Sequence, residues 1–175
     1  MASKSLTFGG VAFLFAAGGV MSCRIFWDRT GWIELLPIPF AVIVILLILR
    51  TPRALLLVPL YVVVWLIAYG VAIFMVPLEW GPYPGPCAGG VIGGLGVWHA
   101  IGFVRPRLLS VNPVGACLVG CIAALPFGLW LTLTHASFSS TGFWINFSFA
   151  TWQACVGTYL YASCRAAKPK PDAGA

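Results

Sequence analysis

Long apolar stretches alternate with short polar segments along almost the whole chain. The stretches cover residues 6–23, 37–49, 54–77, 87–104, 111–133 and 143–163, and for the second of them 37–49 is the core, with a start near Ile33 as the alternative. The longer ones approach the roughly 20 residues that a helix needs to cross about 30 Å of hydrocarbon. The pattern therefore predicts an all-α, polytopic integral membrane bundle with six transmembrane helices.

Basic residues occur where these apolar stretches stop, and their positions predict an orientation. With the N-terminus in the cytoplasm, all but Arg24 and Arg29 of the 10 lysines and arginines lie on the cytoplasmic side. The opposite orientation reverses that ratio and violates the positive-inside rule. We therefore expect both termini in the cytoplasm. The cytoplasmic set is Lys4, Arg50, Arg53, Arg105, Arg107, Arg165, Lys168 and Lys170.

The first apolar stretch has a competing interpretation as a cleaved leader. Residues 20–23 loosely resemble a lipoprotein cleavage box, in which Cys23 would carry the lipid. The single cation at Lys4 and the long, glycine-rich apolar stretch are untypical of a signal peptide, and they favour retention. Removal would leave five spans in the same orientation.

The composition supports a membrane protein with one domain. The chain is 61% hydrophobic and 8% charged, whereas soluble proteins average about 25% charged residues. Its net charge of +6 does not indicate nucleic-acid binding, because the cations lie only at the ends of apolar stretches. We expect one transmembrane domain over residues 1–165 and a short polar cytoplasmic tail over 166–175. Short loops and Ala/Gly/Pro-rich usage favour a bacterial inner membrane.

Prolines dominate the segment that precedes the fourth stretch. Pro82, Pro84 and Pro86 lie between Glu79 and Cys87. Because proline fixes φ and removes a backbone donor, the sequence predicts a stiff, extended connector as far as Cys87.

Glycines give the clearest packing signal. Gly89 pairs with Gly93 and Gly90 with Gly94, each four residues apart in the fourth stretch, and Ala116 and Gly120 form a similar pair in the fifth. Small residues at this spacing let another helix approach to backbone contact, which drives helix association in lipid. We expect the fourth helix at the centre of the bundle or at a subunit interface.

His99 and an aromatic stripe are the main candidates for ligand binding. His99 follows Trp98 in the cytoplasmic half of the fourth stretch, where an imidazole could ligate haem, relay a proton or bind a quinone. A hydrogen bond between helices is the simpler role. Tyr61, Trp65 and Tyr69 recur every four residues on the third stretch and could stack on a ring, although packing or lipid contact is the commoner use.

The sixth stretch is the most polar. Thr151, Cys155 and Thr158 share one face of the expected helix, and Asn146 and Gln153 share another. Such a face could line a water-filled path, and more often it ties helices together at about 0.6 kcal/mol per hydrogen bond.

The six cysteines do not form a metal-ligand pattern, and the sequence identifies no cofactor. Cys23 and Cys87 fall at the outer ends of their expected helices, so they are the one plausible disulfide pair in an oxidising compartment. No nucleophile elbow, phosphate-binding loop or zinc-binding motif is present.

Two functional hypotheses remain. The first is a non-enzymatic membrane protein: a permease-like or channel-like unit for a neutral solute, or an accessory subunit packing against other membrane subunits or a second copy. No aspartate, glutamate, lysine or arginine lies near the middle of a stretch, which disfavours ion-coupled transport. The alternative is a redox or lipid-modifying enzyme that binds a quinone, haem or lipid near His99 and the Tyr61/Trp65/Tyr69 stripe.

Overall fold

The described part of the chain is all helical. The computed structural model describes residues 6–27, 33–75, 82–104, 106, 112–133 and 142–166, and none of them forms a strand. The helices are α1 (Phe8–Ser22), α3 (Ile38–Val44), α4 (Val58–Phe74), α5 (Pro84–Val104), α6 (Pro113–Ala123), α7 (Leu125–Leu133) and α8 (Gly142–Ala166). Short π- or 3-10 helical segments flank the first three of these helices; the segments are Cys23–Trp27, Ile33–Leu35, Ile45–Leu49 and Pro52–Leu57.

Each predicted stretch contains helix, and three of the helices are long and apolar enough to cross a membrane. These are Phe8–Ile25, Pro84–Val104 and Pro113–Trp130. Ile38–Leu49 and Val58–Phe74 are shorter apolar helices. At 1.5 Å per residue, the 12 residues from Ile38 to Leu49 extend only about 18 Å. The three longer helices are what make this all-helical fold compatible with integration into a membrane.

Several parts of the predicted topology lie outside the described residues. They include most of the basic residues that set the predicted orientation and all of the predicted tail except Ala166. The basic residues concerned are Lys4, Arg29, Arg105, Arg107, Lys168 and Lys170.

Local sequence explains where several helices begin and where one breaks. Thr7 caps α1, because its hydroxyl accepts a hydrogen bond from the Gly10 backbone N–H at 3.2 Å. Asn112 caps α6 in the same way, and Pro113 follows at the first helical position. The fifth predicted span is divided at Ala124, because Pro126 has no N–H with which to continue the α-helical ladder.

The prediction of an extended connector as far as Cys87 was wrong. Helix α5 begins at Pro84, so Pro84 and Pro86 lie in its first turn. Proline is tolerated there because the first N–H groups of a helix have no partner within the helix.

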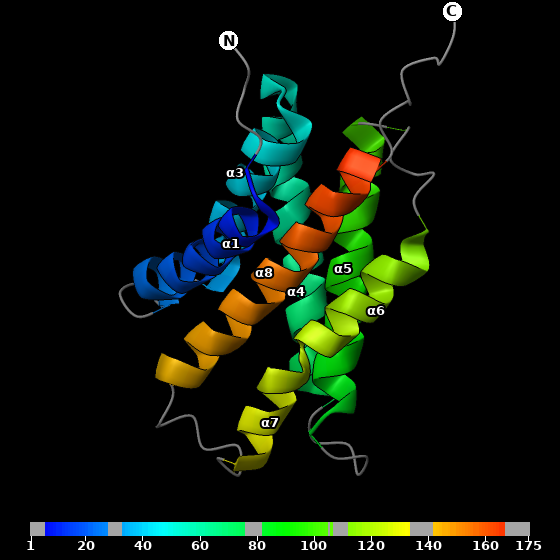
Figure 1. The fold of residues 1–175 in the computed structure, drawn as a ribbon. Helices are drawn as coiled ribbons and strands as arrows, with labels where there is room; N and C mark the ends of the chain where they lie inside the picture. The colour runs from blue at the N-terminus through cyan, green and yellow to red at the C-terminus, as the bar shows by residue number, and fades with distance from the viewer. Residues whose placement is uncertain are drawn as a thin grey trace, which may run out of the picture.

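Successive helices run in alternating directions along the bundle. In Figure 1, α4 and the α6–α7 pair run down the view, α3, α5 and α8 run up, and α1 crosses them at a tilt. The most extensive contacts join α1 to α8, α4 to α5 and α5 to α6. Helix α5 therefore lies between α4 and α6, while α8 links α1 to α6.

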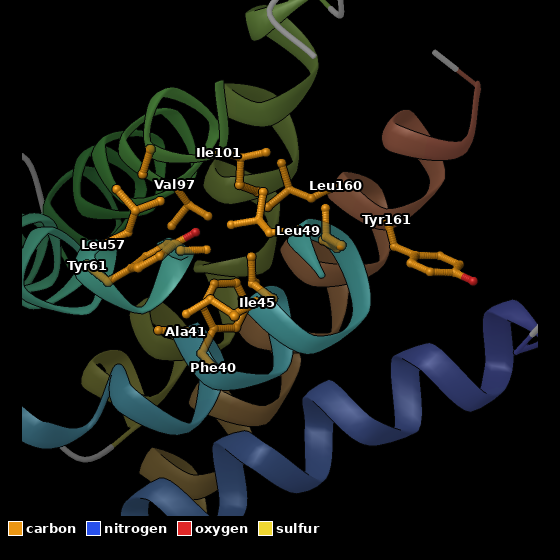
Figure 2. Packing of buried hydrophobic residues seen from close by; sticks show 14 of the residues in the cluster. Phe40, Ala41, Ile45, Leu49, Leu57, Tyr61, Val97, Ile101, Leu160 and Tyr161 are labelled. Atoms are coloured by element: carbon orange, nitrogen blue, oxygen red, sulfur yellow. The ribbon is translucent and has the colours of Figure 1, made fainter. Parts of the chain in front are cut away.

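The hydrophobic core is organised around Phe40 of the short α3 helix. Its ring lies 5.3 Å from that of Phe15 on α1, 5.6 Å from Trp152 on α8 and 6.5 Å from Tyr61 on α4, centroid to centroid. Figure 2 shows Ile45 and Leu49 continuing this face towards Val97 and Ile101 of α5. The short segment thus joins the α1–α8 pair to the α4–α5 pair.

Glycines on two sides of α5 permit its close approach to both neighbours. A Cβ added to Gly89 would lie 2.5 Å from the Ala68 carbonyl oxygen of α4. On the other side, Gly90 meets the backbone of Gly120 and Gly94 meets that of Ala116, both on α6. Because these neighbours are backbone atoms, a side chain at any of these positions would push the helices apart.

We predict that Gly90→Ala destabilises the protein and that Gly70→Ala does not. A methyl group at position 90 would lie 2.8 Å from the Ala124 Cβ, whereas position 70 has nothing within 4 Å. Overpacking of this kind costs about 1–3 kcal/mol, while alanine in place of an exposed helical glycine is neutral or mildly stabilising. Unfolding by SDS titration, followed by circular dichroism, measures both. Equal stability of the two variants would contradict the observed α5–α6 contact.

Candidate functional site

A central, partly open cavity of about 100 Å³ lies between α4, α5 and α8, and residues of α3 and α7 also line it. Its walls are almost entirely apolar and rich in aromatic rings. The lining residues used below are Phe40 from α3, Tyr61, Trp65, Ala68 and Tyr69 from α4, Gly89, Gly90 and Gly93 from α5, Phe127 from α7, and Ser148, Phe149, Trp152 and Gln153 from α8.

The whole aromatic stripe of α4 lines this cavity. Tyr61 is buried, and Trp65 and Tyr69 are half-buried with their ring centroids 5.5 Å apart. Trp65 also meets Phe149 of α8 edge to face, at 4.8 Å between centroids. Since α4 and α8 make no extensive backbone contact, this ring pair is what bridges them along the side of the cavity.

Three buried polar atoms belong to residues that line the cavity, and none of the described residues hydrogen-bonds to them. They are the Tyr61 hydroxyl, the Ser148 hydroxyl and the Gln153 side-chain carbonyl oxygen. The three residues are only 2%, 5% and 2% exposed. A buried polar atom without a partner costs about 1–3 kcal/mol, so each of the three lowers the stability of the folded protein. The Gln153 oxygen lies towards α1, since a Cβ added to Gly18 would lie 3.5 Å from it.

The glycines of α5 shape the wall opposite α8. Gly89, Gly90 and Gly93 line the cavity, and a Cβ at Gly93 would lie 2.8 Å from the Trp152 ring. The Trp152 indole therefore lies directly over the α5 backbone. Gly94 contacts α6 instead and does not line the cavity.

The face of α8 that lines the cavity is not the one formed by Thr151, Cys155 and Thr158. Cys155 is exposed, Thr151 and Thr158 are half-buried, and none of the three lines the cavity. Ser148, Phe149, Trp152 and Gln153 do. The signal for this face was their spacing, since residues i, i+1, i+4 and i+5 share one side of a helix. This face was overlooked in the sequence, because a row of threonine and cysteine side chains is easier to notice than a row that mixes aromatic and polar residues.

His99 lies apart from the aromatic stripe. It is exposed in a separate groove on the outer side of α4 and α5, together with Leu60, Gly96 and Phe103. Its Nδ1–H donates to the Leu95 carbonyl oxygen at 3.0 Å, one turn earlier in α5. Trp98 turns inward and packs against the core. The aromatic stripe and His99 therefore belong to two separate sites, and the other predicted ligand-binding residues line neither of them.

The cysteines take up other positions. In the described structure no disulfide joins Cys23 to Cys87: Cys23 is buried at the end of α1, and Cys87 faces α6 with its Sγ 4.0 Å from the Cys121 carbonyl oxygen. The described residues also contain no group of three or more His, Cys, Asp or Glu side chains able to hold a metal ion.

Comparison with known proteins adds no functional assignment, since no family model, curated protein or solved structure matches this chain.

We predict that Gln153→Leu stabilises the protein in the absence of ligand. Leucine is close in volume to glutamine and removes a buried carbonyl oxygen that has no partner, so the free energy of unfolding should rise by about 1–3 kcal/mol. Cys155→Ala, on the exposed side of the same helix, should stay within about 0.5 kcal/mol of the parent. SDS titration measures both variants. A lower unfolding free energy for Gln153→Leu would show that the amide is satisfied in the folded protein.

Proposed function

We propose that this chain is an integral membrane protein that acts as a small permease-like unit for a neutral solute, which it binds inside the bundle. The cavity between α4, α5 and α8 carries the proposal. Transport and binding sites of membrane proteins are built between helices, where polar groups are kept away from lipid. Ser148 and Gln153 are polar residues in the lining of this cavity.

The chemistry of the cavity wall supports a neutral solute. Among the described residues that line the cavity there is no lysine, arginine, aspartate, glutamate or histidine. A charged solute would lose its hydration without gaining an opposite charge, which costs several kcal/mol in an apolar interior. A neutral molecule of a few heavy atoms does not incur this cost, because it carries no charge that needs hydration or an opposite charge.

We further propose six membrane crossings, with both termini on the cytoplasmic side of a bacterial inner membrane. The alternating directions of the helices support this arrangement (Figure 1). Arg50 directly follows the α3 segment and Arg165 lies in the last turn of α8, and both segments end at the same end of the bundle. Cations gathered at one end agree with the positive-inside rule.

The site geometry gives less support to a redox or lipid-modifying enzyme. That hypothesis drew on His99 and the aromatic stripe together, and the two occupy separate sites. An accessory subunit remains the second candidate within the non-enzymatic class, because exposed apolar side chains cover the outer faces of α1, α4 and α6. In a membrane protein, however, contact with lipid is sufficient to explain exposed apolar faces, and no partner subunit is needed.

We predict that green fluorescent protein fused after Ala166 fluoresces in bacterial cells and that the same protein fused after Leu133 does not. Green fluorescent protein folds in the cytoplasm, and the proposed topology puts the end of α8 inside and the end of α7 outside. Alkaline phosphatase fusions, which need an oxidising compartment, should give the opposite pair of results. Fluorescence at both positions would contradict the crossing by α8.

We predict that the purified protein, reconstituted in liposomes, raises their permeability to at least one of urea, glycerol and resorcinol. Stopped-flow light scattering after an osmotic shock measures the rate. Ala68→Leu, which narrows the cavity, should lower that rate, and Ile67→Leu on the exposed face should leave it unchanged.

Size-exclusion chromatography of both variants serves as the folding control. Liposomes that behave like protein-free ones with all three solutes would refute the permease proposal.

A further inference from the structure

We propose that Cys87 of α5 and Cys121 of α6 form a disulfide bond in the membrane of the cell. The inference goes beyond the proposed function, because neither cysteine lines the cavity. It takes from the proposed topology only that the start of α5 faces an oxidising compartment. Three observations carry it: the contact between the two side chains, the close approach of the two helices, and the partial exposure of both cysteines.

The two side chains meet in the α5–α6 interface. The Cys87 Sγ lies 4.0 Å from the Cys121 carbonyl oxygen, although 34 positions separate the two residues. The two thiol groups also interact with each other, and both are free in the structure. Bond formation therefore needs rotation of the side chains about their Cα–Cβ bonds and no large movement of either helix.

The two backbones lie close together at this level of the bundle. A disulfide joins Cα atoms about 4.4–6.8 Å apart, so it cannot form between helices held at a distance by large side chains. One turn along α5 from Cys87, Gly90 lies in backbone contact with Gly120, the residue directly before Cys121. This contact brings the Cα atoms of the two cysteines towards the range that a disulfide spans.

No other cysteine competes for Cys87. Cys117 follows Ala116, whose carbonyl oxygen meets Gly94, two turns along α5 from Cys87. Cys23 lies at the end of α1, and its segment packs most closely on α1 and α8. The remaining two cysteines lie on α8, one of them exposed and the other packed against the core. Since all six cysteines belong to the described part of the chain, Cys121 is the partner.

The bond forms by thiol–disulfide exchange, and the oxidant is the disulfide of an oxidoreductase in the outer compartment. Neither cysteine is fully buried, and the start of α5 lies at the same end of the bundle as the end of α7 (Figure 1). One cysteine loses its proton, attacks a sulfur of the oxidoreductase disulfide and releases the other sulfur as a thiolate. The second cysteine loses its proton and attacks the chain's sulfur in this mixed disulfide. The new bond forms, and the oxidoreductase leaves with two electrons, as a dithiol.

The test counts free thiols in bacterial cells that produce the full chain. Cells are quenched with acid and denatured in SDS, and a maleimide coupled to polyethylene glycol then adds one mass step per free thiol. We expect the parent chain to carry four labels on its six cysteines, because two are in the bond, and to run as a monomer on a non-reducing gel. Reduction with dithiothreitol before labelling should give six labels.

Single variants identify the partner. Cys87→Ser and Cys121→Ser should each carry five labels, because the cysteine left behind becomes free. Cys155→Ser is the matched control, since it removes an exposed cysteine of α8 and leaves the pair intact, so it should carry three labels. Cys23→Ser should also carry three.

Two results would overturn the inference. Six labels on the unreduced parent chain would show that no bond forms. Three labels on Cys121→Ser together with five on Cys23→Ser would show that Cys87 pairs with Cys23 instead. The count on the parent chain needs no variant, so it stands even where a substitution impairs folding.

The outcomes separate this inference from the permease proposal. Four labels without flux in liposomes would support the disulfide and remove the transport role. Flux together with six labels would retain transport and remove the disulfide. Six labels in cells where the alkaline phosphatase fusion after Leu133 is active would remove the disulfide and retain the topology.

Discussion

The bundle depends on how closely α5 approaches its two neighbours. Gly89 contacts the α4 backbone at Ala68, and Gly90 contacts the α6 backbone at Gly120. Backbone contact at this range gives extensive van der Waals contact, which is the main source of attraction between helices wherever their surroundings are apolar. The two contacts fix α5 from opposite sides and leave its third side facing α8. The space that remains there is the cavity.

The same close packing explains why the cavity persists. Trp152 reaches across from α8 and lies against Gly93, so it covers part of the α5 backbone without filling the gap beside α4. Phe40 occupies the end of the space near α3. Ser148 and Gln153 are buried residues of the lining of this space.

The candidate site could be predicted only in part. The stripe of Tyr61, Trp65 and Tyr69 was visible from its spacing, and all three residues line the cavity. His99 drew attention because an imidazole is rare in an apolar helix, yet it faces outward and donates to its own helix. Ser148 and Gln153, by contrast, did not stand out in the sequence. Each is chemically ordinary, and only the packing of α8 against its neighbours places it in the lining of the cavity.

By itself, the sequence determined that the chain is an all-helical protein with apolar helices, and it placed these helices to within a few residues. That information is local: hydrophobic runs, proline and capping residues act within one or two turns. Only the tertiary structure decided which face of each helix is buried, which rings share a cavity and which cysteines lie near each other. These outcomes depend on contacts between residues such as Phe40 and Trp152, more than 100 positions apart, and no pattern along one helix specifies the rotation of another.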